Sequence, residues 1–280
     1  MKNIYIAILM LLMLLATCFA GFAQAADTEE TTKIGKDIYF TLGYKMWYHS
    51  WQTVSGSQTA SATNPLDGGK NHMTYTSDFI PASIFSTSLK ASNFLIAGSI
   101  MTTPDYTFPV RTDMLASGAT PTPAPLGQYT YRLSGSRKEY DVNLGYYLSP
   151  SIALTVGMKN IKQTYNSLRA DGSIFYTGET DYNGPIVGIT GGGSLGHNFA
   201  FYGNLSYGFL NGTYKSTNTK FDATFNSTEL GIAYRPISYL SFLVGYKYQT
   251  IDNKEPNDSV YKDVGLDVTK GFILGANLTF

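Results

Sequence analysis

The sequence predicts an all-β fold, a closed antiparallel transmembrane β-barrel of about ten strands with short turns at one end and long loops at the other. Three observations favour it: apolar side chains recur at every second position, the second face of these segments is small and polar, and short connections alternate with long ones. In a barrel, closure pairs every strand on both edges, and alternation separates a lipid-facing side from a lumen-facing side.

The composition supports this class and excludes others. Only 14 % of the 280 residues are charged, whereas the chain has 22 Tyr, 16 Phe and 28 Gly. A soluble domain usually carries about 25 % charged residues. Because 20 basic residues balance 20 acidic ones, we expect no basic surface for nucleic-acid phosphates and no nucleic-acid partner. No apolar run after residue 26 approaches the ~18 residues of a spanning helix.

The first 25 residues have the pattern of a cleaved signal peptide. Lys2 precedes the nearly continuous apolar run 4–15, and Ala23-Gln24-Ala25 has the small-x-small pattern of a signal-peptidase site. The alternatives are an N-terminal anchor, for which the run is short, and lipidation at Cys18. Because Cys18 is the only cysteine, the mature chain from residue 26 is expected to lack disulfides and thiol chemistry.

Ten segments have the character of strands. Alternation is clear in 38–46, 140–148, 152–158, 199–209, 230–234, 240–248 and 268–280, and blurred in 74–89, 93–104 and 178–192. A soluble β-sandwich also alternates, but its polar face meets water and is expected to be rich in Lys and Glu. Here that face is mostly Gly, Ser, Thr and Asn, which favours the barrel.

The connections orient the predicted barrel. Short turns are expected near 90–93, 149–151, 194–198 and 236–239, and long loops near 53–72, 105–127, 166–177, 212–221 and 253–266. The long ones are rich in Gly, Ser, Thr, Asn, Asp and Pro, as loops are. Strict alternation of short and long connections places all turns at one end and all loops at the other.

The end of the chain carries a resemblance. The alternating strand from Lys270 closes on the terminal aromatic Phe280, which resembles the insertion signal of Gram-negative outer-membrane proteins that the barrel-assembly machinery recognises. The resemblance covers the mature chain as a pattern and names a class of small barrel, not one family. It implies an outer-membrane location among lipid and lipopolysaccharide, and a periplasmic C-terminus. The expected organisation is a signal peptide (1–25), a short periplasmic segment (26–36) and the barrel (37–280), with a monomer favoured.

Two hairpin registers predict charged pairs inside the lumen. If the turn at 149–151 sets Leu148 against Ile152, paired numbers sum to 300, and Asp141 lies opposite Lys159. If Tyr234 faces Phe242, the sum is 476, and Glu229 lies opposite Lys247. With Lys45, Arg137 and Glu139 on the same side, these residues are expected to form a charged plug. The alternatives are that they line a wet lumen independently, or that either register differs by two residues.

Other motifs carry weaker signals. Gly191, Gly193 and Gly196 spell G-x-G-x-x-G, but a strand rather than a helix follows, which indicates a glycine-rich strand end and turn and not a nucleotide site. Trp47 and Trp51, with Tyr44 and Tyr48, are interpreted as an aromatic girdle rather than a ligand platform.

The sequence does not predict an enzyme. The three histidines are too scattered for a metal site, and we expect no metal and no cofactor. A hydrolase that combines His49 or His72 with Ser50 and Asp105 is the least favoured interpretation. Omptin proteases resemble the chain in strand count, but the acidic and histidine residues that they need at the outer rim have no matching motif here.

Two function classes therefore remain open after the fold. The first is a structural role or a narrow small-solute channel, because ten strands enclose a cylinder of roughly 20 Å that side chains largely fill. The second is recognition outside the cell by the long loops, as in an adhesin or receptor.

Overall fold

The computed structural model describes residues 38–56, 72–108, 111–114, 128–168, 171–254 and 265–280. The expected signal peptide and the segment that follows it lie outside these residues. Within the described ranges, no helix is long and apolar enough to cross a membrane.

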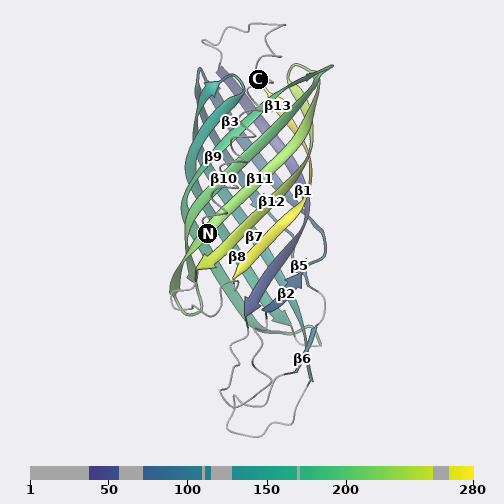
Figure 1. Ribbon diagram of the computed structural model, residues 1–280. Coiled ribbons are helices and arrows are strands. Elements are labelled where there is room, and N and C mark those ends of the chain that lie inside the picture. The colour runs from purple at the N-terminus through teal and green to yellow at the C-terminus, as the bar shows by residue number, and fades with distance from the viewer. Residues whose placement is uncertain (1–37, 57–71, 109–110, 115–127, 169–170, 255–264) are drawn as a thin grey trace.

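Ten strands make a closed antiparallel barrel, and Figure 1 shows them tilted relative to the axis of the cylinder. They are β1 (Ile38–Gly56), β3 (Ile80–Ala91), β4 (Phe94–Thr102), β7 (Gln128–Ser149), β8 (Ile152–Leu168), β9 (Ile174–Gly196), β10 (Phe199–Tyr214), β11 (Thr219–Ile237), β12 (Leu240–Lys254) and β13 (Leu266–Thr279). Each strand pairs with its neighbour in this order, and the pairing of β13 with β1 closes the sheet. The predicted fold class is confirmed.

Three short strands extend the wall rather than adding to its number. They are β2 (His72–Thr76), β5 (Tyr106–Thr107) and β6 (Arg111–Met114). β2 pairs with β1 beyond the end of β3, while β5 and β6 pair with β7 beyond the end of β4. Each is therefore a continuation of the barrel strand next to it in the chain.

A shift of one residue between β2 and β3 interrupts the alternation of 74–89, and a second shift follows β4 at the end of 93–104. Paired numbers sum to 240 between β4 and β7 but to 241 between β5 and β7, so one extra residue lies on the β4–β5 side. Such a bulge reverses the odd–even relationship between position and face. Met101 is buried inside at an odd number, and Tyr106 and Phe108 are buried inside at even numbers.

All four predicted turns lie at one end, the turn end, together with the C-terminus (Figure 1). In the β9–β10 turn, His197 and Asn198 both have positive φ (51° and 67°), as a two-residue type I′ hairpin requires. Gly196 before them has φ 83°. The glycine-rich segment is thus a strand end and turn, as predicted, and not a phosphate-binding loop.

We call the opposite end the loop end. Two of the five long loops predicted there are short in the structure, so these two predictions are wrong. β8 continues to Leu168 and β9 begins at Ile174, while only residues 215–218 separate β10 from β11. The segments 166–177 and 212–221 are polar, yet most of their residues pair across the β8–β9 and β10–β11 ladders, with one register shift at Ser167/Leu168. Strand formation needs paired backbone groups, and a strand that continues beyond the bilayer needs no apolar face. Polarity was therefore a poor signal for a loop there.

The outer face of the wall is apolar. On β7, β8, β11 and β12 the exposed side chains at alternate positions are Val142, Leu144, Leu154, Val156, Leu230, Ile232, Phe242 and Val244. Inward neighbours such as Ala153 and Leu243 are buried. This belt is the surface that a bilayer covers.

The loop half of the interior is packed with side chains. Three clusters of buried residues fill it: Trp47, Ala82, Ile84, Met101 and Ile273; Trp51, Tyr75, Tyr106 and Phe108; and Ile161, Tyr182, Ile186, Leu210, Phe221, Ala223, Phe225 and Ile251. Charged residues lie on the turn side of these clusters. Cavities lie between the charged residues and the turn end.

Candidate functional site: the charged layer of the lumen

Seven charged side chains from five strands meet near mid-barrel, and we refer to them as the charged layer. They are Lys45, Arg137, Glu139, Asp141, Lys159, Glu229 and Lys247, the same seven that the sequence predicts for the lumen. Each lies on the inward face because neighbouring positions on its strand carry the exposed apolar belt.

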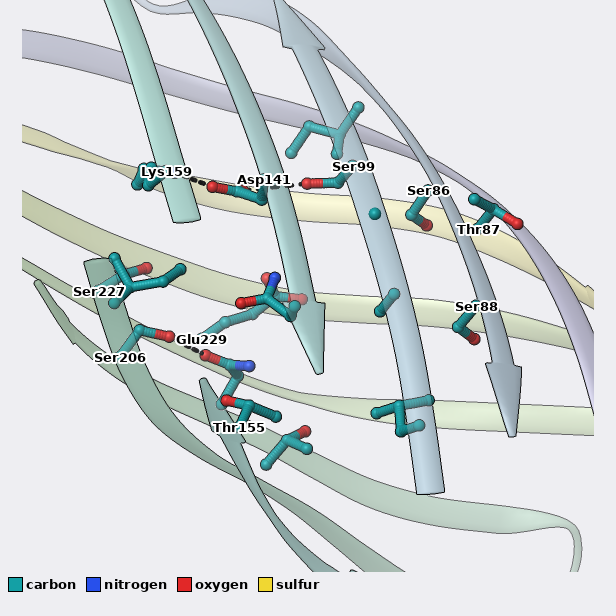
Figure 2. Close-up of a pocket in the computed structure, with 18 of the residues that line it drawn as sticks. Ser86, Thr87, Ser88, Ser99, Asp141, Thr155, Lys159, Ser206, Ser227 and Glu229 are labelled. Atoms are coloured by element: carbon teal, nitrogen blue, oxygen red, sulfur yellow. Dashed lines mark hydrogen bonds and ion pairs between the residues drawn. The ribbon is translucent and has the colours of Figure 1, made fainter. Parts of the chain in front are cut away.

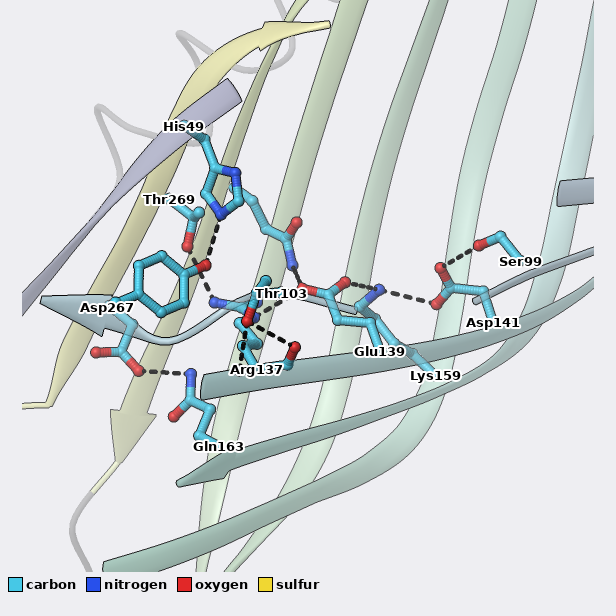
Figure 3. A network of polar contacts seen from close by, with 12 residues as sticks. His49, Ser99, Thr103, Arg137, Glu139, Asp141, Lys159, Gln163, Asp267 and Thr269 are labelled. Atoms are coloured by element: carbon cyan, nitrogen blue, oxygen red, sulfur yellow. Dashed lines mark hydrogen bonds and ion pairs between the residues drawn. The ribbon is translucent and has the colours of Figure 1, made fainter. Parts of the chain in front are cut away.

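Glu139 lies at the centre of the layer (Figure 3). Its Oε1 is 2.7 Å from Arg137 Nε, and its Oε2 is 2.7 Å from Lys159 Nζ. Gln249 Nε2 also donates to Glu139 Oε1 at 2.9 Å. The exposed fractions of Arg137, Glu139 and Lys159 are 1 %, 2 % and 3 %. Burying three charges is costly unless they compensate one another, so the contacts are mutually dependent.

Lys159 joins two carboxylates. Its Nζ lies 2.8 Å from Asp141 Oδ1 as well as against Glu139, and Asp141 Oδ2 accepts a hydrogen bond from Ser99 at 3.0 Å. Asp141 lies directly opposite Lys159 in the β7–β8 ladder. The structure therefore has the register that the sequence predicts for this hairpin.

The second hairpin also has its predicted register, but its expected ion pair is not formed. Glu229 lies opposite Lys247 in the β11–β12 ladder. Its Oε1 instead lies 2.5 Å from Nζ of Lys45 on β1. Lys247 Nζ lies 4.7 Å from the centroid of the Trp47 ring, a cation–π contact. The predicted pair is not formed because the long side chains of Lys45 and Glu229 reach each other across the lumen. The pairing of neighbouring strands does not describe such a contact.

The interpretation of the tryptophans as a girdle is also wrong. Trp47 and Trp51 are completely buried in the lumen, whereas Tyr44 and Tyr48 on alternate positions are exposed. Trp47 stacks on His49 with ring centroids 4.1 Å apart, and Trp51 contacts Tyr106 at 5.0 Å. The even-numbered residues of β1 from Ile38 to Tyr48 face outward and are exposed, so only the tyrosines are positioned for the bilayer interface.

Further polar residues lie on the loop side of the layer. Sequence reasoning considered His49 only for a hydrolase and missed the others. His49 Nε2 lies 2.5 Å from the Tyr106 hydroxyl, and Arg137 Nη1 donates to Thr269 Oγ1 at 3.0 Å. Gln163 Nε2 donates to Asp267 Oδ2 at 3.0 Å (Figure 3). Inward parity on β1, β8 and β13 was the available signal for His49, Gln163 and Asp267. The bulge before β5 hid that signal for Tyr106.

On the turn side of the charged layer, the lumen is hollow. An inner chamber of about 390 Å³ has Asp141, Lys159 and Glu229 on its wall with hydroxyls such as Ser86 and Ser206 (Figure 2). A wider mouth of about 1,380 Å³ extends to the turn residues Pro150 and His197. The two cavities share the lining residues Lys45, Tyr147 and Asn277 and therefore adjoin each other.

The residues considered for a hydrolase do not come together. Successive strand residues point to opposite faces, so His49 faces the lumen and Ser50 does not. Asp105 is exposed, and the His72 side chain lies outside the described part of the chain. No cluster of three or more His, Cys, Asp or Glu residues suited to a metal is found among the described residues.

Phe280 lies at the closing seam of the barrel. Its backbone N–H donates to Phe40 O at 2.8 Å, and Phe40 N–H donates to Phe280 O at 3.1 Å. The Phe280 side chain is exposed and stacks loosely on Phe40, with centroids 6.4 Å apart. The terminal residue therefore completes the ladder between the last strand and the first.

No protein-family model matches the sequence, and no curated protein matches it significantly. Solved structures do match. The outer membrane protease OmpT from Escherichia coli is similar with a TM-score of 0.53 at 13 % identity, over 91 % of this chain and 100 % of that one. A major outer membrane protein from Thermus thermophilus has a TM-score of 0.37 at 13 % identity, over 87 % and 99 %. The translocator domain of the autotransporter NalP from Neisseria meningitidis has a TM-score of 0.41 at 8 % identity, over 95 % of both chains.

At this identity the likeness to OmpT establishes the fold and not the activity. The closed sheet and the apolar outer belt agree with it. The chain has the fold of an outer-membrane β-barrel protein, with ten strands.

Proposed function

We propose that the protein is a sealed structural barrel of the outer membrane, which does not conduct solutes in its resting state. In this proposal, membrane lipid and lipopolysaccharide surround the belt, and the chain acts as a monomer. The charged layer is a permanent part of the barrel core rather than the lining of a pore.

The observation that carries the proposal is the burial of the Arg137–Glu139–Lys159 cluster. Its paired atoms lie 2.7 Å apart and are almost inaccessible to solvent. On the loop side of this cluster, Trp47, Trp51 and Ile161 are fully buried. A hydrated ion that crossed this level would have to separate paired buried charges and displace packed aromatic rings, each of which opposes passage.

Single-protein recording in a planar lipid bilayer tests the seal. The refolded full-length protein should give no conductance steps above those of bare lipid, while Glu139→Ala should give flickering openings because it removes the centre of the cluster. The exposed carboxylate of Glu179 provides the control: Glu179→Ala should stay silent. Steady openings of the unmodified protein would favour the alternative, a narrow channel for small solutes.

A second candidate function, recognition at the loop end, has its own observation. Strands β7 to β11 continue beyond the belt and present exposed polar side chains, among them Lys138, Lys162, Glu179 and Asp222. These form a polar wall suited to contact with a macromolecule outside the membrane. Cells that display the protein should then bind a glycan or matrix array better than cells with an empty vector. Binding that survives charge reversal at Lys162 and Asp222 would argue against this wall as the contact surface.

A further inference from the structure

The turn-side cavities have features of a binding site that the sealed barrel does not require. The inner chamber is within the size range of small-molecule pockets. It ends at the charged layer, and the mouth opens between the turns of the barrel. A solute that passes from the mouth into the adjoining chamber would meet the turn side of the charged layer and would not have to cross that layer.

The charges of the cavity walls do not balance. Four cationic side chains, Lys45, Lys159, Lys247 and Arg235, line the two cavities against two carboxylates, Asp141 and Glu229. Adding Arg137 and Glu139 behind them leaves the excess of two positive charges unchanged, because these two oppose each other. The walls thus favour an anion.

Lys247 supplies the cation best placed to bind a solute. Lys45 and Lys159 are engaged with carboxylates at 2.5–2.8 Å. Among the described residues, no carboxylate oxygen lies within 4.0 Å of Lys247 Nζ, which instead lies over the face of Trp47. An ammonium has three N–H donors, and a ring face leaves them without acceptors.

The mouth of the cavity also carries positive charge. Arg235 is exposed there beside His197, and no carboxylate side chain appears on the described part of its lining. The inner wall carries many hydroxyls and amides, including Ser88, Thr190 and Asn204, beside apolar side chains such as Leu95 and Phe225. Such groups bind hydroxylated ligands by hydrogen bonds, whereas an apolar ligand would leave them unpaired.

We propose that the turn-side cavity binds a small hydroxylated anion, such as a sugar phosphate or sugar acid, with its charged group on Lys247 and its hydroxyls on the Ser, Thr and Asn side chains of the chamber. Arg235 at the mouth attracts the anion electrostatically. This inference does not depend on the seal, since the cavity lies on one side of the charged layer.

Isothermal titration calorimetry on the full-length protein in detergent micelles tests it with three probes: glucose 6-phosphate, inorganic phosphate and glucose. Glucose 6-phosphate should bind most tightly, phosphate more weakly, and glucose not measurably. Lys247→Gln should weaken binding of glucose 6-phosphate about tenfold, which is the loss of one charge-assisted contact. Lys247→Arg should retain most of the affinity. Lys220→Gln, at the exposed loop end, should bind normally.

Arg235→Gln keeps the experiment decisive if Lys247→Gln fails to fold, as judged by the mobility of unheated protein in dodecyl sulfate. Because Arg235 is exposed, this variant should fold. It should bind glucose 6-phosphate more weakly than the unmodified protein at low salt. Equal binding of glucose and glucose 6-phosphate, no binding of any probe, or full affinity in a folded Lys247→Gln variant would overturn the proposal. If Lys247→Gln does not fold, full affinity in Arg235→Gln would overturn it.

Discussion

Lys45 Nζ lies 2.5 Å from Glu229 Oε1 although β12 and β13 separate their strands in the sheet. Glu229 has a lysine directly opposite it in the ladder, Lys247, and does not pair with it. The contact therefore joins two walls of the barrel through the lumen, a role that no pair of neighbouring strands can fill.

The first prediction is that this contact couples Lys45 and Glu229 energetically. A double-mutant cycle of Lys45→Met and Glu229→Gln should give a coupling of about 1–2 kcal/mol in the free energy of unfolding, as for a partly buried charged hydrogen bond. Urea titration of the barrel in phospholipid vesicles measures it. The cycle of Lys247→Met with Glu229→Gln is the comparison and should give less than about 0.5 kcal/mol. A larger coupling for Lys247 would show that the ladder partner is the true one.

The second prediction concerns Glu139. Glu139→Gln keeps the shape of the side chain but leaves Arg137 and Lys159 without the charge between them, so the free energy of unfolding should fall by about 3–5 kcal/mol. The same urea titration tests this. Glu179→Gln, at an exposed carboxylate on β9, should change stability by less than about 0.5 kcal/mol. Equal effects of the two substitutions would mean that the cluster does not stabilise the barrel.

The third prediction rests on a close approach of strands. A Cβ atom at Gly271 would lie 2.5 Å from His49 Cα and would also collide with the Tyr48 carbonyl oxygen. These are backbone atoms, so Gly271→Ala must push β13 away from β1 at the closing seam, at a cost of about 1–3 kcal/mol. Closure is measured as the fraction of protein that migrates faster in dodecyl sulfate gels when it is not heated than after boiling.

Gly98 offers the matched control for this substitution. A Cβ there would lie 3.5 Å from the Asp141 carbonyl oxygen, an ordinary contact. Gly98→Ala should therefore close normally, and normal closure of both variants would contradict the proposed steric conflict at Gly271.

The fourth prediction separates folding from assembly at Phe280. Phe280→Ser keeps both backbone hydrogen bonds to Phe40 and removes an exposed ring, so refolded protein should lose less than about 1 kcal/mol. In cells the amount of assembled barrel should fall, because the terminal aromatic is the expected insertion signal. Phe94→Ser removes another exposed ring at the turn end and should assemble normally. Normal cellular assembly of Phe280→Ser would show that the terminal ring is incidental.

Several features followed from local sequence because they depend on local geometry. Alternation over 38–46 or 240–248 reports which face of a strand is apolar, and a short turn fixes the register of its two strands. Asp141 against Lys159 and Glu229 against Lys247 needed no more than these two facts. The inward position of Trp47 was available from its parity with Lys45, but the general preference for an aromatic girdle outweighed it.

The sequence alone thus determined the barrel class, the number of strands, two hairpin registers and the seven side chains of the charged layer. The tertiary structure decided which of those charges meet. The choice of Lys45 over Lys247 by Glu229 depends on the distance across a closed cylinder, and the inward turn of Tyr106 depends on a one-residue bulge. The first is a contact between segments far apart in the chain, and the second is an extra residue that is recognised only by its pairing with the partner strand β7. A period read along one strand contains no information about either.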